Sequence, residues 1–149
     1  MLENVKRILV PVDFSDNSPK IFKAAANVAR KFAAELTCLY VVQDFIDYDG
    51  FAIEHMPMIQ FHEEMQASAK KKMTEFMRDN LPHDLTVSSS VRVGDVGEEI
   101  VAFAAREKID LIVIGTHGYK GLDRILFGSV AAQVVKTAAC PVLTVNPWR

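Results

Sequence analysis

The chain contains the stretch Ile109-Asp110-Leu111-Ile112-Val113-Ile114-Gly115-Thr116-His117-Gly118, in which an apolar run leads directly into a glycine-rich loop. Nine residues separate this stretch from Gly128-Ser129, and a helical pattern starts at Val130. Glycine lets the backbone approach a ligand closely, and the free N–H groups at a helix start favour a phosphate. At the average glycine frequency of proteins, about 7%, the pattern G-x2-G-x9-G-[S/T] arises by chance in roughly one of two hundred chains this long. Strand, loop and helix together predict a phosphate-binding site.

Strands and helices alternate along the whole chain. The apolar runs and helical spacings predict strands at Val5–Val12, Leu36–Val42, Leu85–Val93, Ile109–Ile114 and Val142–Val145, and helices from Ser18 to about Glu35, from Met58 to about Asn80, from Asp95 to about Glu107 and from Val130 to Ala138. This order predicts an α/β, Rossmann-like fold. A single domain over residues 1–149 would hold a five-stranded parallel sheet with helices on both faces. Ligands bind such sheets beyond the carboxyl ends of the strands, where the loops 11–15 and 115–128 are expected to meet.

Several details of these elements can be predicted. Ser18-Pro19 has the residue types of an N-cap and a first helical position, and the helix that follows is expected to bury Phe22, Ala25, Ala29 and Phe32. Asp95 is expected to cap the third helix, and Ser129 the last one. The partly alternating third strand is expected to lie at an edge or to expose one face.

Composition and charge exclude other classes of protein. The formal net charge of −2 gives no electrostatic footprint for nucleic acid, and Lys70–Lys72 is interpreted as a solvated helix face. The sequence shows no signal peptide, and no apolar run approaches the ~20 residues that span a bilayer. Cys38 and Cys140 lack C-x-x-C spacing and are interpreted as buried, reduced thiols that behave as small hydrophobic residues. These features predict a cytoplasmic protein.

Asp13 ends the first strand and is a candidate ligand-binding residue. Its carboxylate could accept hydrogen bonds from a base or a ribose, or help to hold Mg²⁺ bound to phosphates. The alternative is an Asx-type turn that caps the strand-to-helix loop.

The glycine loop supplies further candidates. His117 could face a phosphate with its backbone N–H and its imidazole, although no partner for a general base is evident. Thr116 could add a hydroxyl group, whereas Lys120 and Arg124 are interpreted as solvated loop charges. His55, His62 and His83 form no metal-binding motif, and neither G-x4-G-K-[S/T] nor an early G-x-G-x-x-G is present.

The segment Gln43–Pro57 is unusually apolar for a connection. It carries Phe45, Ile46, Tyr48, Phe51 and Ile53. Such a loop either packs back on its own domain or forms a lid or a partner surface.

These residues resemble the universal stress protein family over essentially the whole chain. Gly115, Gly118, Gly128 and Ser129 fill the family's G-x2-G-x9-G-[S/T] motif, and the flanking segments 121–130 and 140–145 are also similar to it. The resemblance implies the strand order 3-2-1-4-5 and a homodimer formed partly by the last strand, Val142–Val145. It implies a stress-response protein that binds ATP or another adenine nucleotide with Mg²⁺.

By position, the resemblance also implies the residues of the nucleotide site. Asp13 and the backbone near Val41 would hold the adenine, and Pro11, Val12 and His117 would lie near the nucleoside. The phosphates would lie near Gly118, Gly128, Ser129 and Val130. The rest of the expected site consists of Gly94, Gly115 and Thr116, with Gly94 and Val41 assigned by position alone.

Phe14 stands where many members of the family have a small residue, and its ring could crowd the adenine or pack beneath the helix. Three functions stay open. The first is a nucleotide-dependent regulatory module, the second a slow ATPase or phosphotransferase, and the third a ligand-free dimeric protein that uses the loop Phe45–Ile53 to bind an unidentified protein partner.

Overall fold

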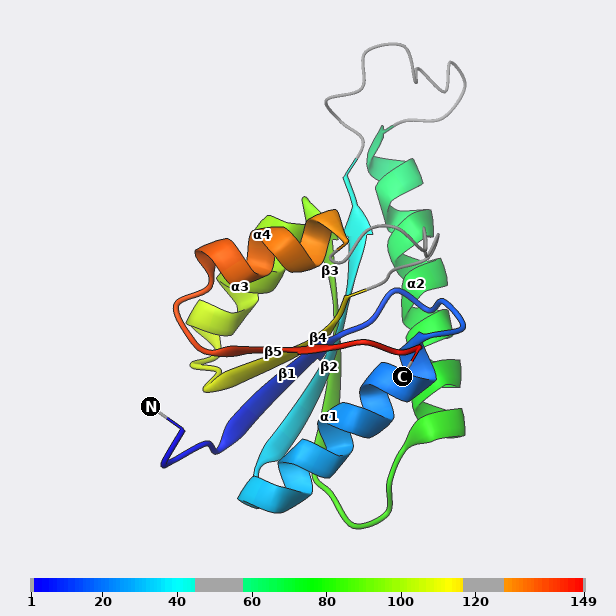
Figure 1. Ribbon diagram of the computed structural model, residues 1–149. Coiled ribbons are helices and arrows are strands. Elements are labelled where there is room, and N and C mark those ends of the chain that lie inside the picture. The colour runs from blue at the N-terminus through cyan, green and yellow to red at the C-terminus, as the bar shows by residue number, and fades with distance from the viewer. Residues whose placement is uncertain (1, 45–57, 117–127, 149) are drawn as a thin grey trace.

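In the described part of the chain, a five-stranded parallel sheet is flanked by four helices (Figure 1). The computed structural model describes residues 2–44, 58–116 and 128–148. The elements in chain order are β1 (Arg7–Pro11), α1 (Ser18–Phe32), β2 (Glu35–Gln43), α2 (Met58–Asn80), β3 (Val87–Gly94), α3 (Val96–Arg106), β4 (Leu111–Gly115), α4 (Ser129–Thr137) and β5 (Val142–Val145). The strand order β3-β2-β1-β4-β5 confirms the predicted α/β architecture.

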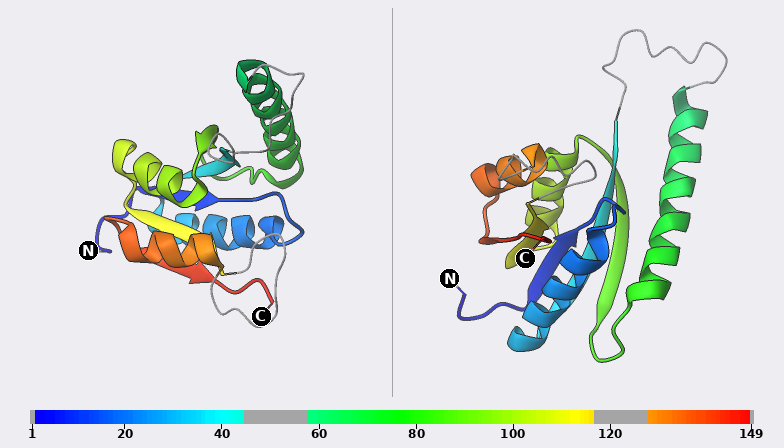
Figure 2. Two further views of the ribbon diagram at one scale, coloured as in Figure 1. Left: turned by 90° about the horizontal axis from the view of Figure 1, so that it is seen from above. Right: turned by 45° about the vertical axis from the view of Figure 1, so that its right-hand side comes forward.

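Two apolar layers hold the helices to the sheet. Helices α1 and α2 cover one face, and α3 and α4 cover the other (Figure 2, right). Neighbouring residues of β1 supply both layers, because Ile8 and Val10 face α1 whereas Leu9 faces α3. The sequence of a central strand is therefore continuously apolar, as expected where both faces are covered.

The position of β1 creates the place where a ligand can enter. Val10 of β1 pairs with Cys38 of β2, and Leu9 pairs with Ile112 of β4. The chain leaves β1 toward one face of the sheet through α1 and leaves β4 toward the other face through α4. The carboxyl ends of β1 and β4 thus form the switch point at which parallel sheets bind ligands.

The ends of α1 differ from the prediction. Asn17 is the N-cap and Ser18 is the first helical residue, because the Ser18 hydroxyl bonds Asp13 instead of capping the helix. The helix ends at Phe32 and not near Glu35, since Ala33 takes the left-handed conformation with φ 53°. The Phe32 side chain, predicted to be buried, is 37% exposed.

The start of α4 differs in the same way, with Gly128 as N-cap and Ser129 as the first helical residue.

Other predictions about the elements and their residues are confirmed. Asp95 caps α3 by accepting the Glu98 N–H at 3.1 Å, β3 is an edge strand, and Lys70–Lys72 are exposed. Both cysteines are free thiols as predicted, and Cys38 is buried, whereas Cys140 is only half-buried. In the described parts of the chain, no helix combines the length and hydrophobicity needed to cross a bilayer.

Candidate functional site: a cavity at the carboxyl ends of β1 and β4

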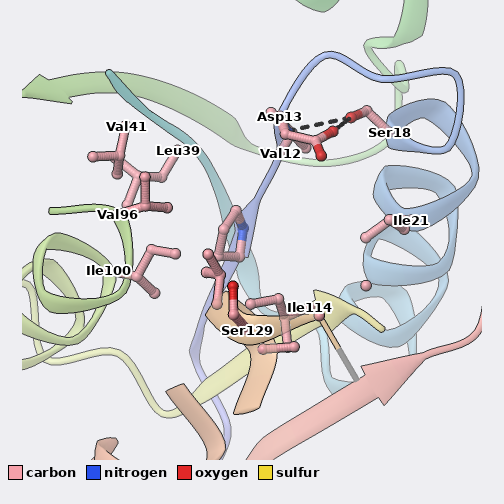
Figure 3. Close-up of a pocket in the computed structure, with 15 residues that line it drawn as sticks. Val12, Asp13, Ser18, Ile21, Leu39, Val41, Val96, Ile100, Ile114 and Ser129 are labelled. Atoms are coloured by element: carbon pink, nitrogen blue, oxygen red, sulfur yellow. Dashed lines mark hydrogen bonds between the residues drawn. The ribbon is translucent and has the colours of Figure 1, made fainter. Parts of the chain in front are cut away.

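A cavity of about 290 Å³ lies at the switch point (Figure 3). It opens between the strand ends and the first turns of α1, α3 and α4. The described residues that line it are Pro11, Val12, Asp13, Ser18, Ile21, Leu39, Val41, Val96, Ile100, Ile114, Gly115, Gly128, Ser129, Val130 and Ala131. Segments that are far apart in the sequence therefore contribute to one concave surface.

One wall of the cavity is apolar. Leu39 and Val41 project from β2 toward Val96 and Ile100 of α3 (Figure 3). Leu39 and Val41 lie two residues apart and so share one face of their strand, while Val96 and Ile100 share one face of their helix. This wall offers a surface against which a flat, largely apolar group such as a nucleobase can pack.

Asp13 supplies a carboxylate at the opposite side of the cavity. Its Oδ1 accepts the Ser15 backbone N–H at 2.9 Å and the Ser18 hydroxyl at 3.0 Å. The bond to Ser15 confirms the Asx-type turn. That turn does not exclude a ligand, because no described residue donates a hydrogen bond to Asp13 Oδ2. Asp13 is also the sole carboxylate among the described residues of the lining.

The N-terminus of α4 forms the third part of the site. Gly128, Ser129 and Val130 all line the cavity, and the first N–H groups of a helix have no partners within the helix. Helix α3 has the Asp95 cap and two acidic residues, Glu98 and Glu99, in its first turn. Helix α4 has no side-chain cap and no acidic residue in its first turn. Its positive end is therefore open to an external anion, and it lies at the cavity.

Most of the site residues expected from the sequence meet in this cavity. Pro11, Val12, Asp13, Val41, Gly115, Gly128, Ser129 and Val130 all line it. His117 and Gly118, with Lys120 and Arg124, lie outside the described residues, as do the apolar side chains of the loop 45–57.

Thr116 and Gly94 lie next to the site but not in its lining. The Thr116 N–H donates to the Val145 carbonyl at 2.9 Å, and the Thr116 carbonyl accepts the Gly128 N–H at 2.7 Å. Thr116 thus ties the start of α4 to the end of β5. The Gly94 carbonyl accepts the Asp44 N–H at 2.9 Å, and a Cβ at Gly94 would meet the Glu99 side chain.

The structure adds lining residues that sequence reasoning missed, which are Ser18, Ile21, Leu39, Val96, Ile100, Ile114 and Ala131. Two signals could have found some of them. Leu39 shares the strand face of Val41, and Ile100 shares the helix face of Val96, the first residue after the Asp95 cap. The others have the composition of ordinary core residues.

The Phe14 ring packs away from the cavity. Its centroid lies 4.4 Å from that of Tyr40 and 5.8 Å from that of Phe76, within the layer under α1 and α2. Phe14 adopts a positive φ of 61°, which turns the side chain to that face. Phe14 is absent from the lining, so of its two interpretations the structure favours packing beneath the helix.

The described histidines lie outside the cavity. His62 Nε2 lies 3.5 Å from Asp44 Oδ1 at the start of α2, and His83 is exposed. No group of three or more His, Cys, Asp or Glu side chains in the described ranges could hold a metal ion. His55 belongs to the segment outside them.

Comparison with known proteins gives the family. The model of the universal stress protein family matches residues 4–146. The chain belongs to the universal stress protein family.

Relatives and solved structures agree with this assignment. Universal stress protein MJ0531 of Methanocaldococcus jannaschii is 41% identical over 146 residues, covering 95% of this chain and 82% of its own length. The structure of universal stress protein UspA from Lactobacillus plantarum is 30% identical, with a TM-score of 0.80, and the match covers 96% of this chain and 99% of that one. A universal stress protein from Archaeoglobus fulgidus, solved in complex with dAMP, is 22% identical with a TM-score of 0.60 over 96% of this chain and 99% of its own.

Proposed function

We propose that this chain is a universal stress protein that binds an adenine nucleotide, ATP foremost, in the cavity and acts as a nucleotide-dependent regulatory module in the stress response. The observation that carries the proposal is the combination of three surfaces around one cavity. They are the apolar wall of Leu39, Val41, Val96 and Ile100, the open oxygen of Asp13, and the uncapped N-terminus of α4.

Each surface suits one part of a nucleotide. The apolar wall suits the base, the Asp13 oxygen suits an N–H or O–H donor of the base or ribose, and the helix N-terminus suits the phosphates. The dAMP complex of the Archaeoglobus fulgidus protein is a property of that protein, and it agrees with an adenine nucleotide as the class of ligand. Mg²⁺ would enter with the phosphates, since Mg²⁺ usually takes one or two carboxylates together with phosphate oxygens.

We also propose that two copies associate through β5. It is a four-residue edge strand whose Leu143 side chain is 42% exposed. An exposed apolar edge strand is a template for pairing unless something covers it, and a second β5 would do so.

A cavity-filling variant tests the nucleotide site. Val96→Phe places a ring in the space proposed for the base, whereas Val135→Phe makes the same change on α4 at a residue outside the lining that is 48% exposed. In calorimetry with nucleotide-stripped protein, Val96→Phe should weaken ATP binding at least about tenfold, because the lost contacts are worth more than about 1.4 kcal/mol. Val135→Phe should bind like the wild type.

Equal affinities of the two variants would contradict the assignment of the cavity. Thermal unfolding of both variants shows that any loss of binding occurs in folded protein. A parallel titration in EDTA tests the part of Mg²⁺, which should strengthen ATP binding in the wild type.

A further inference from the structure

The Asp13 carboxylate is held by a buried hydroxyl group. Ser18, the first residue of α1, is completely buried. Its Oγ donates to Asp13 Oδ1 at 3.0 Å and accepts the Asp13 backbone N–H at 3.3 Å (Figure 3). The serine therefore contacts both the main chain and the side chain of the same residue and restricts the rotation of the carboxylate.

This arrangement makes the two carboxylate oxygens unequal. Oδ1 accepts two hydrogen bonds, from the Ser15 N–H and from the Ser18 hydroxyl. Oδ2 receives none from the described residues and belongs to a side chain that lines the cavity. A carboxylate fixed in this way presents one acceptor at a defined point to a donor group of a ligand.

We infer that Ser18 is a positioning residue for nucleotide recognition, acting through Asp13 by fixing which oxygen faces the cavity. This inference rests on the proposed function. It adds that the ligand must place an N–H or O–H donor at Oδ2, and that the affinity for that donor depends on a hydroxyl group that need not touch the ligand.

Asp13→Asn separates the acceptor that Asp13 offers to the ligand from the turn that Asp13 forms. The Ser15 N–H and the Ser18 hydroxyl both require an acceptor, so the amide oxygen should take the place of Oδ1 and the NH₂ group the place of Oδ2. The turn is preserved while the acceptor offered to the ligand becomes a donor. Ser15→Ala is the matched control for Ser18→Ala, because the Ser15 Oγ has no hydrogen-bond partner in the described part of the chain and its N–H survives the change.

The experiment is a double-mutant cycle of ATP binding by calorimetry. Ser18→Ala should weaken binding about tenfold in the wild-type background and less than about twofold in Asp13→Asn, because there the oriented acceptor is already gone. Ser15→Ala should leave binding unchanged. An equal loss from Ser18→Ala in both backgrounds would show direct contact of Ser18 with the ligand and overturn the inference, as would the absence of a loss in the wild-type background.

A measurement without nucleotide separates this inference from the proposed function. If Ser18 fixes the carboxylate, Ser18→Ala should increase hydrogen exchange of the Ser15 amide at least about fivefold, since its acceptor becomes mobile. Unchanged protection of that amide would overturn the positioning role whether or not ATP binds. Faster exchange of the Ser15 amide in Ser18→Ala, together with no ATP binding to the wild type, would contradict the proposed nucleotide binding but support the role of Ser18 in positioning the Asp13 carboxylate.

Discussion

At the scale of single residues, the segment from the loop after β1 to the first residue of α1 contains two buried hydroxyl groups with opposite effects on stability. The Ser18 Oγ makes two hydrogen bonds to Asp13, whereas the Ser15 Oγ makes none with the described residues. A buried polar group without a hydrogen-bond partner destabilises the folded state, whereas one that is bonded to a charged group stabilises it. The same substitution should therefore change stability in opposite directions at two sites three residues apart.

Ser18→Ala should lower the free energy of unfolding by about 2 kcal/mol, since one of the lost bonds is to a carboxylate. Ser15→Ala should leave it unchanged or raise it by up to about 1 kcal/mol. Urea unfolding monitored by circular dichroism measures both values. A larger loss in Ser15→Ala than in Ser18→Ala would contradict the hydrogen bonds described here.

Cys38 gives the folded state a dependence on alkaline pH. Burial raises the pKa of its thiol from 9.0 to about 12, so the folded state resists ionisation that the unfolded state allows. The resulting stability is complete below about pH 9 and is lost as the pH rises toward 12. Between pH 9 and 11, the free energy of unfolding should fall more steeply for the wild type than for Cys38→Ala, by up to about 1.4 kcal/mol per pH unit. Urea unfolding at these pH values measures both free energies. An equal fall with pH in the wild type and in Cys38→Ala would contradict the raised pKa of Cys38.

At the scale of the elements, α1 ends at a residue that is poorly suited to its conformation. Ala33 has φ 53° and ψ 43°, and its N–H bonds the carbonyls of Ala29 and Arg30. Left-handed backbone costs an L-residue roughly 1 kcal/mol or more, a cost that glycine avoids.

Ala33→Gly should therefore raise the free energy of unfolding by about 0.5–1 kcal/mol. Ala102→Gly, the same change at an exposed residue inside α3, should lower it by about 1 kcal/mol. Thermal or urea unfolding of the two variants measures the sign of the change in the free energy of unfolding for each. A destabilised Ala33→Gly variant would show that the end of α1 is not left-handed in solution.

The elements also show which parts of the fold can be read from the sequence. The runs Arg7–Pro11 and Leu111–Gly115 are predictable as strands because both faces of a central strand need apolar residues. The start of α1 is not predictable, because the Ser18 hydroxyl can either cap a helix or bond Asp13. Which of the two bonds forms depends on the conformation of the folded loop. Asp13 is predictable as a site residue because a carboxylate at a strand end is conspicuous. Leu39 and Ile100 are not, because a ligand-facing apolar residue has the same chemistry as a core residue.

At the scale of the whole molecule, the two edges of the sheet differ. Strand β3 is an edge of eight residues, and β5 is a short edge that exposes Leu143. The proposed homodimer would cover the β5 edge and leave β3 to solvent.

Leu143→Glu should convert the dimer to a monomer, because the substitution introduces like charges on both sides of the contact. Ile59→Glu, at the start of α2 and 73% exposed, should leave the mass unchanged. Sedimentation velocity at micromolar concentration measures both. A monomeric wild type, or a dimeric Leu143→Glu variant, would remove β5 as the interface.

The central claim is that an adenine nucleotide binds between the carboxyl ends of β1 and β4. The most direct test is an NMR titration of nucleotide-stripped, isotope-labelled protein with ATP and Mg²⁺, followed through the backbone amides. Saturable shifts should concentrate at Val12–Asp13, Val41 and Ser129–Ala131. The absence of saturation at millimolar ATP would contradict the claim. So would shifts confined to a different groove between α1 and the end of α2, whose lining includes Lys20, Lys23, Asp79 and Asn80.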